Sequence, residues 1–156
     1  MSLLKNAIES IQVGVEDYEI GEERRYLSAV RNISAGILLL YKEKLRRLSP
    51  PDAEELLIKS SIEPMLDKQG KVIFKGKGKK TVDVQTIRQR FKSLGIEYTW
   101  TNFDELNELR NNIEHYYTDK SPSAIREVIA KSFVLIHEFI NQHLEEETHQ
   151  LLGDKC

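Results

Sequence analysis

The sequence predicts an all-α protein: an up-and-down helical bundle with a small inserted β-hairpin. Two long segments carry apolar residues at the spacing of a helix, and the clearest strand-prone runs flank a turn rich in glycine. The chain has 156 residues, 40% hydrophobic and 31% charged, which is enough to bury one core. We therefore expect residues 1–156 to form a single helical domain.

The first half of the chain predicts two helices and a shorter helical segment. A short helix is expected over residues 3–12 and a long one over residues 22–48, where two prolines follow as a stop. Leu38 and Leu39 make the middle of the long helix apolar on all sides, so this stretch is expected in the bundle centre or at a subunit interface. Asp52 is a candidate N-cap for the third segment, which runs towards Pro64.

Residues 67–84 are predicted to form a basic hairpin inserted between helices. The strand-prone runs 71–74 and 81–84 flank Gly76 and Gly78, which would form the turn. Nine basic residues and one acidic residue lie between positions 68 and 92, so cations of this segment could contact RNA phosphates. The alternative is a solvated turn whose lysines prevent strands from pairing at the edge. The candidate contacts are Lys75, Lys77, Lys79 and Lys80.

Three further helices and a tail are expected after the hairpin. Apolar spacing predicts a helix over 85–94, another from Thr101 or Asn102 onwards, and a last one from Ser121 to about residue 144. The last two should pack as an antiparallel pair. Residues 145–156 are acidic, and we expect them to form a frayed tail.

Composition points to a cytoplasmic protein without a metal or a cofactor. Cys156 is the only cysteine, which excludes an internal disulfide and a metal cluster built on cysteine, and favours a reducing compartment. The most apolar window, residues 37–41, is far too short to cross a bilayer, so no membrane contact is expected. His137, His143 and His149 recur every six residues, a step of ~240° on a helix, and cannot line one metal site.

The most informative stretch runs from Arg110 to Tyr117 and places a guanidinium, an imidazole and a phenol late in one helix. On an ideal helix His115 lies ~140° from Arg110, whereas Tyr117 lies within ~20° of it. Asn111 falls on the side of His115, the more exposed side. A single site that uses both Arg110 and His115 therefore requires long side chains, a distorted helix end or a second subunit.

The pattern Arg-x4-His-x-Tyr, formed by Arg110, His115 and Tyr117, resembles the motif of the HEPN family. Asn111, which directly follows the arginine, adds to the resemblance. The match is strict for the motif and loose for the helical bundle, residues 26–48 and 102–144. Members of this family are small helical proteins, and many are metal-independent ribonucleases. The resemblance implies an endoribonuclease of toxin or phage-defence type, a homodimer that cleaves an RNA substrate with Arg110 and His115.

Family members with this motif are often silenced by a partner. A minimal nucleotidyltransferase antitoxin attaches AMP to the motif tyrosine, so the resemblance implies Tyr117 as a modification site and such an antitoxin as a possible partner. The alternative for Tyr117 is a core residue with its hydroxyl at the rim, because tyrosine on a packing face commonly has that role.

The residue types suit RNA cleavage without a metal. A histidine can take the proton of the 2′-hydroxyl, and an arginine can stabilise charge on the phosphate. Asn111 could hold the imidazole or contact phosphate, and Glu114 could instead pair with Arg110 one turn away. Such an Arg110–Glu114 surface pair beside a solvent-facing His115 would be unremarkable in a charged helix. A non-catalytic HEPN-like interaction module therefore remains the alternative function.

Overall fold

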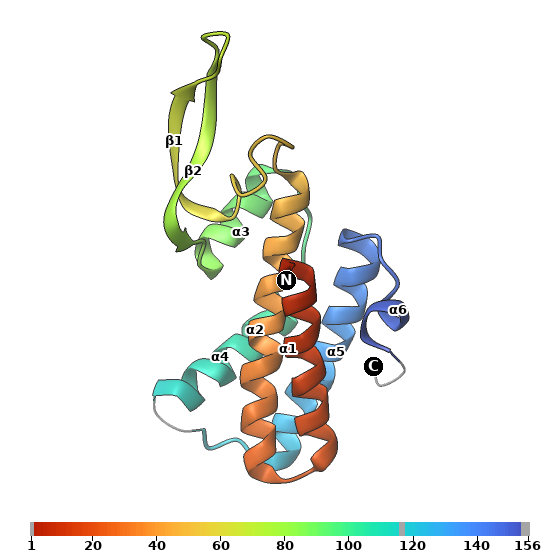
Figure 1. Ribbon diagram of the computed structural model, residues 1–156. Coiled ribbons are helices and arrows are strands. Elements are labelled where there is room, and N and C mark those ends of the chain that lie inside the picture. Colours follow the sequence, from red (N-terminus) through yellow and green to blue (C-terminus); the bar gives the residue numbers. More distant parts are fainter. Residues whose placement is uncertain (1, 116–117, 154–156) are drawn as a thin grey trace. The chain divides into compact units, whose positions relative to one another are not determined.

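The computed structural model describes residues 2–115 and 118–153, which are mostly helical and carry one two-stranded antiparallel sheet (Figure 1). A helical fold with an inserted hairpin is therefore confirmed. The described elements, in chain order, are α1 (Leu3–Ile20), α2 (Glu23–Leu48), β1 (Lys59–Leu66), β2 (Val72–Thr81), α3 (Val84–Ser93), α4 (Thr101–His115), α5 (Pro122–His143) and α6 (Thr148–Leu152).

The chain divides into two compact units. The first unit contains residues 1–40 and 99–156, and the second contains residues 41–98. Helix α2 begins in the first unit and ends in the second. The single domain expected from the sequence stays a prediction. No helix among residues 2–115 and 118–153 combines the length and the apolar composition needed to cross a membrane.

Helix α1 of the first unit extends eight residues beyond the predicted segment 3–12, so that boundary was wrong. Its apolar stripe continues, because Ile11 and Val15 are both buried. The helix ends at Gly21, whose φ of 78° is the left-handed conformation that glycine adopts without a steric penalty. At the other end the Ser2 hydroxyl accepts a backbone N–H and caps the first turn.

Helices α1 and α2 lie side by side and approach closely through two glycines (Figure 1). A Cβ atom on Gly14 of α1 would lie 2.5 Å from Cγ1 of Ile33. A Cβ atom on Gly36 of α2 would lie 2.5 Å from Cγ1 of Ile11. Each glycine thus makes room for an isoleucine of the other helix, and the two helices interlock in the core of the first unit.

A buried carboxylate fixes the same helix pair near the turn that joins them. Asp17 of α1 is only 6% exposed and accepts from the Ser28 hydroxyl at 2.6 Å. Arg25 and Asn32 also donate to it, each at 3.3 Å. All three donors belong to α2, so the network satisfies the buried charge and sets the register of the two helices.

The hairpin of the second unit differs from the predicted one. Strand β1 pairs with β2 from Leu66 opposite Val72 onwards, and the turn between them covers residues 67–71. The Asp67 carboxylate accepts the backbone N–H groups of Gln69 and Lys71, which stabilises the turn there. The predicted strand 71–74 is confirmed as the start of β2, whereas the predicted strand 81–84 and the turn between the two were wrong, because β2 continues to Thr81 and α3 begins at Val84.

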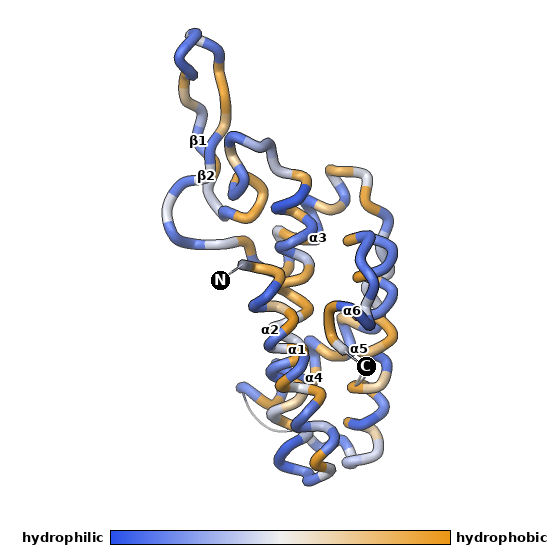
Figure 2. The backbone as a smooth tube through the Cα atoms, turned by 45° about the vertical axis from the view of Figure 1, so that its right-hand side comes forward, coloured by the Kyte–Doolittle hydropathy of each residue, from blue (hydrophilic) through white to orange (hydrophobic). Residues whose placement is uncertain are grey.

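The glycines that suggested the turn have other roles. Gly76 lies within β2, opposite Ile62, where the Lys59 side chain occupies the space of a Cβ atom. Gly78, with a φ of 78°, lies where the register shifts between the strands. The third helical segment predicted towards Pro64 was also wrong, because that stretch forms turns and then β1. Figure 2 shows that apolar residues of β2 gather next to the turn.

Aromatic residues and one arginine hold the second unit together. Tyr41 and Phe91 are buried with their rings edge to face, 5.8 Å apart. Arg90 of α3 donates to the backbone carbonyls of Leu57 and Lys59, each at 2.7 Å. This bond pair ties α3 to the chain entering β1, and burial lowers the pKa of Arg90.

The last helices belong to the first unit. Helix α5 starts as predicted, with the Ser121 hydroxyl accepting the backbone N–H of Ala124 at 3.1 Å. It packs against α4, and Lys131 of α5 forms an ion pair with Glu105 of α4 at 3.2 Å. A frayed tail was expected after residue 144, but residues 148–152 form the short helix α6. Leu152 of this helix is buried in the first unit.

Candidate functional site

Helix α4 carries the motif and is anchored through its first three turns. Phe103, Leu106 and Leu109 are fully buried along one side, as their spacing predicts. Arg110, directly after this stripe, is half-buried, whereas His115 is exposed as the last residue of the helix. Arg110 and His115 therefore lie in the last two turns of α4, after its buried stripe.

The Arg110 guanidinium contacts the neighbouring amide. Its Nη1 atom donates to Oδ1 of Asn111 at 3.3 Å, a long hydrogen bond between a cation and a neutral acceptor. Among the described carboxylates, none forms an ion pair with Arg110. An arginine with such a weak neutral partner keeps most of its donors available for an anion.

Glu114 pairs with a residue outside the motif. Its Oε1 atom accepts from Nε of Arg31 on α2 at 3.0 Å, with the two side chains 36% and 50% exposed. The expected alternative, in which Glu114 pairs with Arg110 one turn away, is not the arrangement found. The sequence offered no signal for Arg31, because 83 residues separate the two partners. Only the packing of α2 beside the end of α4 brings them together.

The remaining motif residues are His115, Asn111 and Tyr117. His115 and Asn111 are both exposed, so an RNA strand could reach either side chain. Tyr117, the possible modification site, lies outside the described residues.

A shallow hollow of about 290 Å³ lies between α4 and α5. Its lining is mostly charged, with Glu105 and Glu108 from α4 and Glu127 and Lys131 from α5. On an ideal helix Glu108 lies ~160° from Arg110, which places the hollow on the His115 side of α4. Lys120 also lines the hollow, so three carboxylates stand against two ammonium groups, and the lining offers a phosphate no excess of positive charge.

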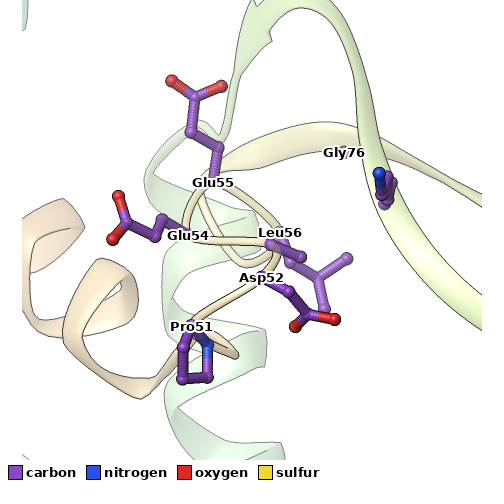
Figure 3. A pocket seen from close by; sticks show the side chains of 8 residues that line it. Pro51, Asp52, Glu54, Glu55, Leu56 and Gly76 are labelled. Carbon is purple, nitrogen blue, oxygen red and sulfur yellow. The ribbon is translucent and has the colours of Figure 1, made fainter.

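Lys77 and Lys75 are two candidate lysines of the hairpin whose surroundings include carboxylates. Lys77 forms an ion pair with Glu63 of the paired strand at 3.3 Å. Lys75 lines a second hollow, of about 450 Å³, together with Asp52 and Glu54. Figure 3 shows the Glu54 carboxylate pointing away from the strand that carries Gly76. These contacts lie within the second unit, whereas the motif belongs to the first.

Three aromatic residues that precede the motif in sequence, Tyr98, Trp100 and Phe103, make packing contacts within their own units. In the second unit Tyr98 makes a 2.8 Å hydroxyl–hydroxyl contact with Tyr41. In the first unit Trp100 packs edge to face on Phe103, and Phe103 is fully buried. Phe103 is therefore a core residue and is not available for stacking on a base.

The chain matches no protein-family model, no curated protein and no solved structure. The motif and the geometry around α4 are thus the basis for a functional interpretation. Within the described part of the chain, no three histidine, cysteine, aspartate or glutamate side chains group as a metal site would require.

Proposed function

We propose that the protein is a metal-independent endoribonuclease of toxin or phage-defence type. In this proposal it is a cytoplasmic up-and-down helical bundle that cleaves RNA at a site formed by two copies of α4. The supporting observation lies at the end of α4: among the described residues the Arg110 guanidinium donates a hydrogen bond only to the neutral amide of Asn111, and His115 is exposed five residues later.

The proposed reaction is an internal displacement at phosphorus. His115 takes the proton of the 2′-hydroxyl, the 2′ oxygen forms a bond to phosphorus, and the bond to the 5′ oxygen breaks. A water molecule gives a proton to the leaving 5′ oxygen, so one imidazole and one guanidinium suffice for each site. Arg110 stabilises the charge that develops on the other phosphate oxygens. The product is a 2′,3′-cyclic phosphate or its opened form.

Two further groups have supporting roles in this proposal. Asn111 positions either the imidazole or the phosphate. Lys79 and Lys80, with smaller contributions from Lys75 and Lys77, add affinity for RNA that does not depend on sequence. A nucleotidyltransferase-type antitoxin would silence the enzyme by modifying Tyr117.

The test is cleavage of RNA by the purified protein in excess chelator. We expect a 2′,3′-cyclic phosphate end, and a rate at least ~100-fold lower in His115→Ala and in Arg110→Ala, the usual scale for losing a general base or a phosphate-stabilising charge. His137→Ala is the matched control, because His137 is an exposed histidine on α5 outside the motif. Its rate should equal that of the wild type.

Two results would contradict the proposal. Full activity in both motif variants would show that Arg110 and His115 do not act in cleavage. A wild type that binds RNA but leaves it intact would favour the non-catalytic interaction module.

A further inference from the structure

Glu114 is placed where it could block the arginine that the proposed site depends on. It follows Arg110 by four residues, the spacing at which a glutamate and an arginine meet on a helix surface. A carboxylate presents two oxygens to a guanidinium in the same geometry as a phosphate. A Glu114 side chain turned towards Arg110 would therefore occupy the donors that an RNA phosphate needs.

The structure shows Glu114 turned towards α2 instead. Its Oε1 atom lies 3.0 Å from Nε of Arg31, while the Arg110 guanidinium donates to Asn111 at the longer distance of 3.3 Å. One carboxylate thus lies within reach of two arginines, and the arginine of the other helix holds it. Loss of Arg31 would leave Arg110 as the cation one helical turn from Glu114.

We infer that Arg31 is a positioning residue, which keeps the Glu114 carboxylate away from Arg110 and so leaves Arg110 available for a phosphate of RNA. This inference rests on the proposed function for its substrate, but the placement of the carboxylate can be measured without it. Arg31 acts through Glu114 and does not itself contact RNA.

The expected effect is small, because both ion pairs are exposed to water. Exposed pairs and pairs four residues apart on a helix each shift an equilibrium by a factor of roughly two to five. Arg31→Gln should therefore weaken binding of an uncleavable, 2′-O-methylated oligoribonucleotide by roughly this factor. In a Glu114→Gln background the same change should have no specific effect, because no carboxylate is left to release.

A matched control separates this effect from the loss of any cation. Lys131 forms a 3.2 Å ion pair with Glu105 that also joins α4 to a neighbouring helix, at 42% and 41% exposure. Lys131→Gln removes one positive charge and one interhelical pair without releasing Glu114. Both variants are expected to lose some affinity for RNA. The effect specific to Arg31 is the amount by which Arg31→Gln weakens binding more than Lys131→Gln does.

A spectroscopic measurement tests the placement directly. The Nε–Hε signal of Arg110, identified by its absence from an Arg110→Lys spectrum, reports whether a carboxylate accepts from this guanidinium. We expect it to shift in Arg31→Gln, to return in Arg31→Gln/Glu114→Gln, and to stay unchanged in Lys131→Gln. This signal requires neither RNA nor catalysis, so it remains informative if the protein proves not to cleave RNA.

Two outcomes would overturn the inference. An Arg110 signal that does not move in Arg31→Gln would show that Glu114 does not turn to Arg110. RNA binding that stays equally weakened by Arg31→Gln in the Glu114→Gln background would show that Arg31 contacts RNA itself.

Discussion

Glu43 is a buried carboxylate in the last two turns of α2, within the second unit. Arg46 donates to it through Nε at 2.6 Å and Nη2 at 3.0 Å, and Arg47 donates through Nε at 2.9 Å. Burial alone would raise the pKa of Glu43, but the hydrogen bonds and charges of the two arginines outweigh burial and lower it. A carboxyl group whose pKa is lower in the folded protein than in the unfolded chain stabilises the fold above the unfolded pKa.

This stabilisation should be lost in acid. As the pH falls below the ordinary glutamate value, about 4.3, towards the lower folded value, the wild type should lose stability through Glu43. Glu43→Gln should cost about 1–3 kcal/mol at pH 7, the range for hydrogen bonds to a charged group, and less at acid pH. Urea unfolding at several pH values measures both effects. Glu9→Gln is the control, since its contact with Lys5 is long and exposed. Equal pH profiles in wild type and Glu43→Gln would contradict the prediction.

At the scale of elements, glycine makes room for a neighbouring side chain both where α1 meets α2 and within the hairpin. Gly14 and Gly36 are buried, and each allows close packing against an isoleucine. Gly76 lies in β2. Several apolar residues of the hairpin are exposed: Leu66 at 65%, Val72 at 61% and Phe74 at 54%. Gly76 itself is crowded, because a Cβ atom there would meet Cβ and Cγ of Lys59, so packing limits substitution at all three glycines.

Gly36→Ala should destabilise the protein although alanine favours a helix by about 1 kcal/mol. The added methyl group would meet the Ile11 side chain and lie only 3.0 Å from the Ala7 carbonyl oxygen, and overpacking of this kind costs about 1–3 kcal/mol. We expect a lower midpoint of urea unfolding. Glu16→Ala, an exposed position on α1, should change stability by less than about 0.5 kcal/mol. A Gly36→Ala protein more stable than the wild type would show that the helices can move apart freely.

At the scale of the whole molecule, the proposed site needs residues from two chains. Arg110 and His115 lie ~140° apart around the axis of an ideal helix, so a single α4 directs them to different sides. Leu38 and Leu39 remain half-buried in the single chain, where the sequence predicted burial in the core or at an interface. A two-fold axis beside α4 would bring two copies of each motif residue around one cleft.

The protein should therefore be a homodimer with shared sites. Sedimentation should give twice the chain mass of 18.1 kDa. Mixing Arg110→Ala and His115→Ala chains should restore roughly a quarter of the wild-type activity, because half of the dimers are mixed and each keeps one complete site. Each variant alone is the control and should stay inactive. A single-chain mass at micromolar concentration would contradict the shared site.

The sequence by itself determined three of the helices, α2, α4 and α5, and their buried faces. The periodic apolar residues of α2, α4 and α5 predicted these helices, because burying an amphipathic face is what makes a helix stable in a protein. The motif on α4 was also visible, since all its residues lie within eight positions. The hairpin was placed wrongly because glycines suggested a turn that the Asp67 carboxylate forms elsewhere.

Tertiary structure decided the contacts between residues that are distant in the chain. Spacing within α4 suggested Glu114 as a partner for Arg110, but packing of α2 brought Arg31 to within 3.0 Å of it. The close approach of Gly14 and Gly36 to isoleucines of the facing helix likewise has no signature in either segment alone. Periodicity reports which side of a helix is buried, whereas the partner on that side depends on how all the helices pack, and this is a property of the folded chain.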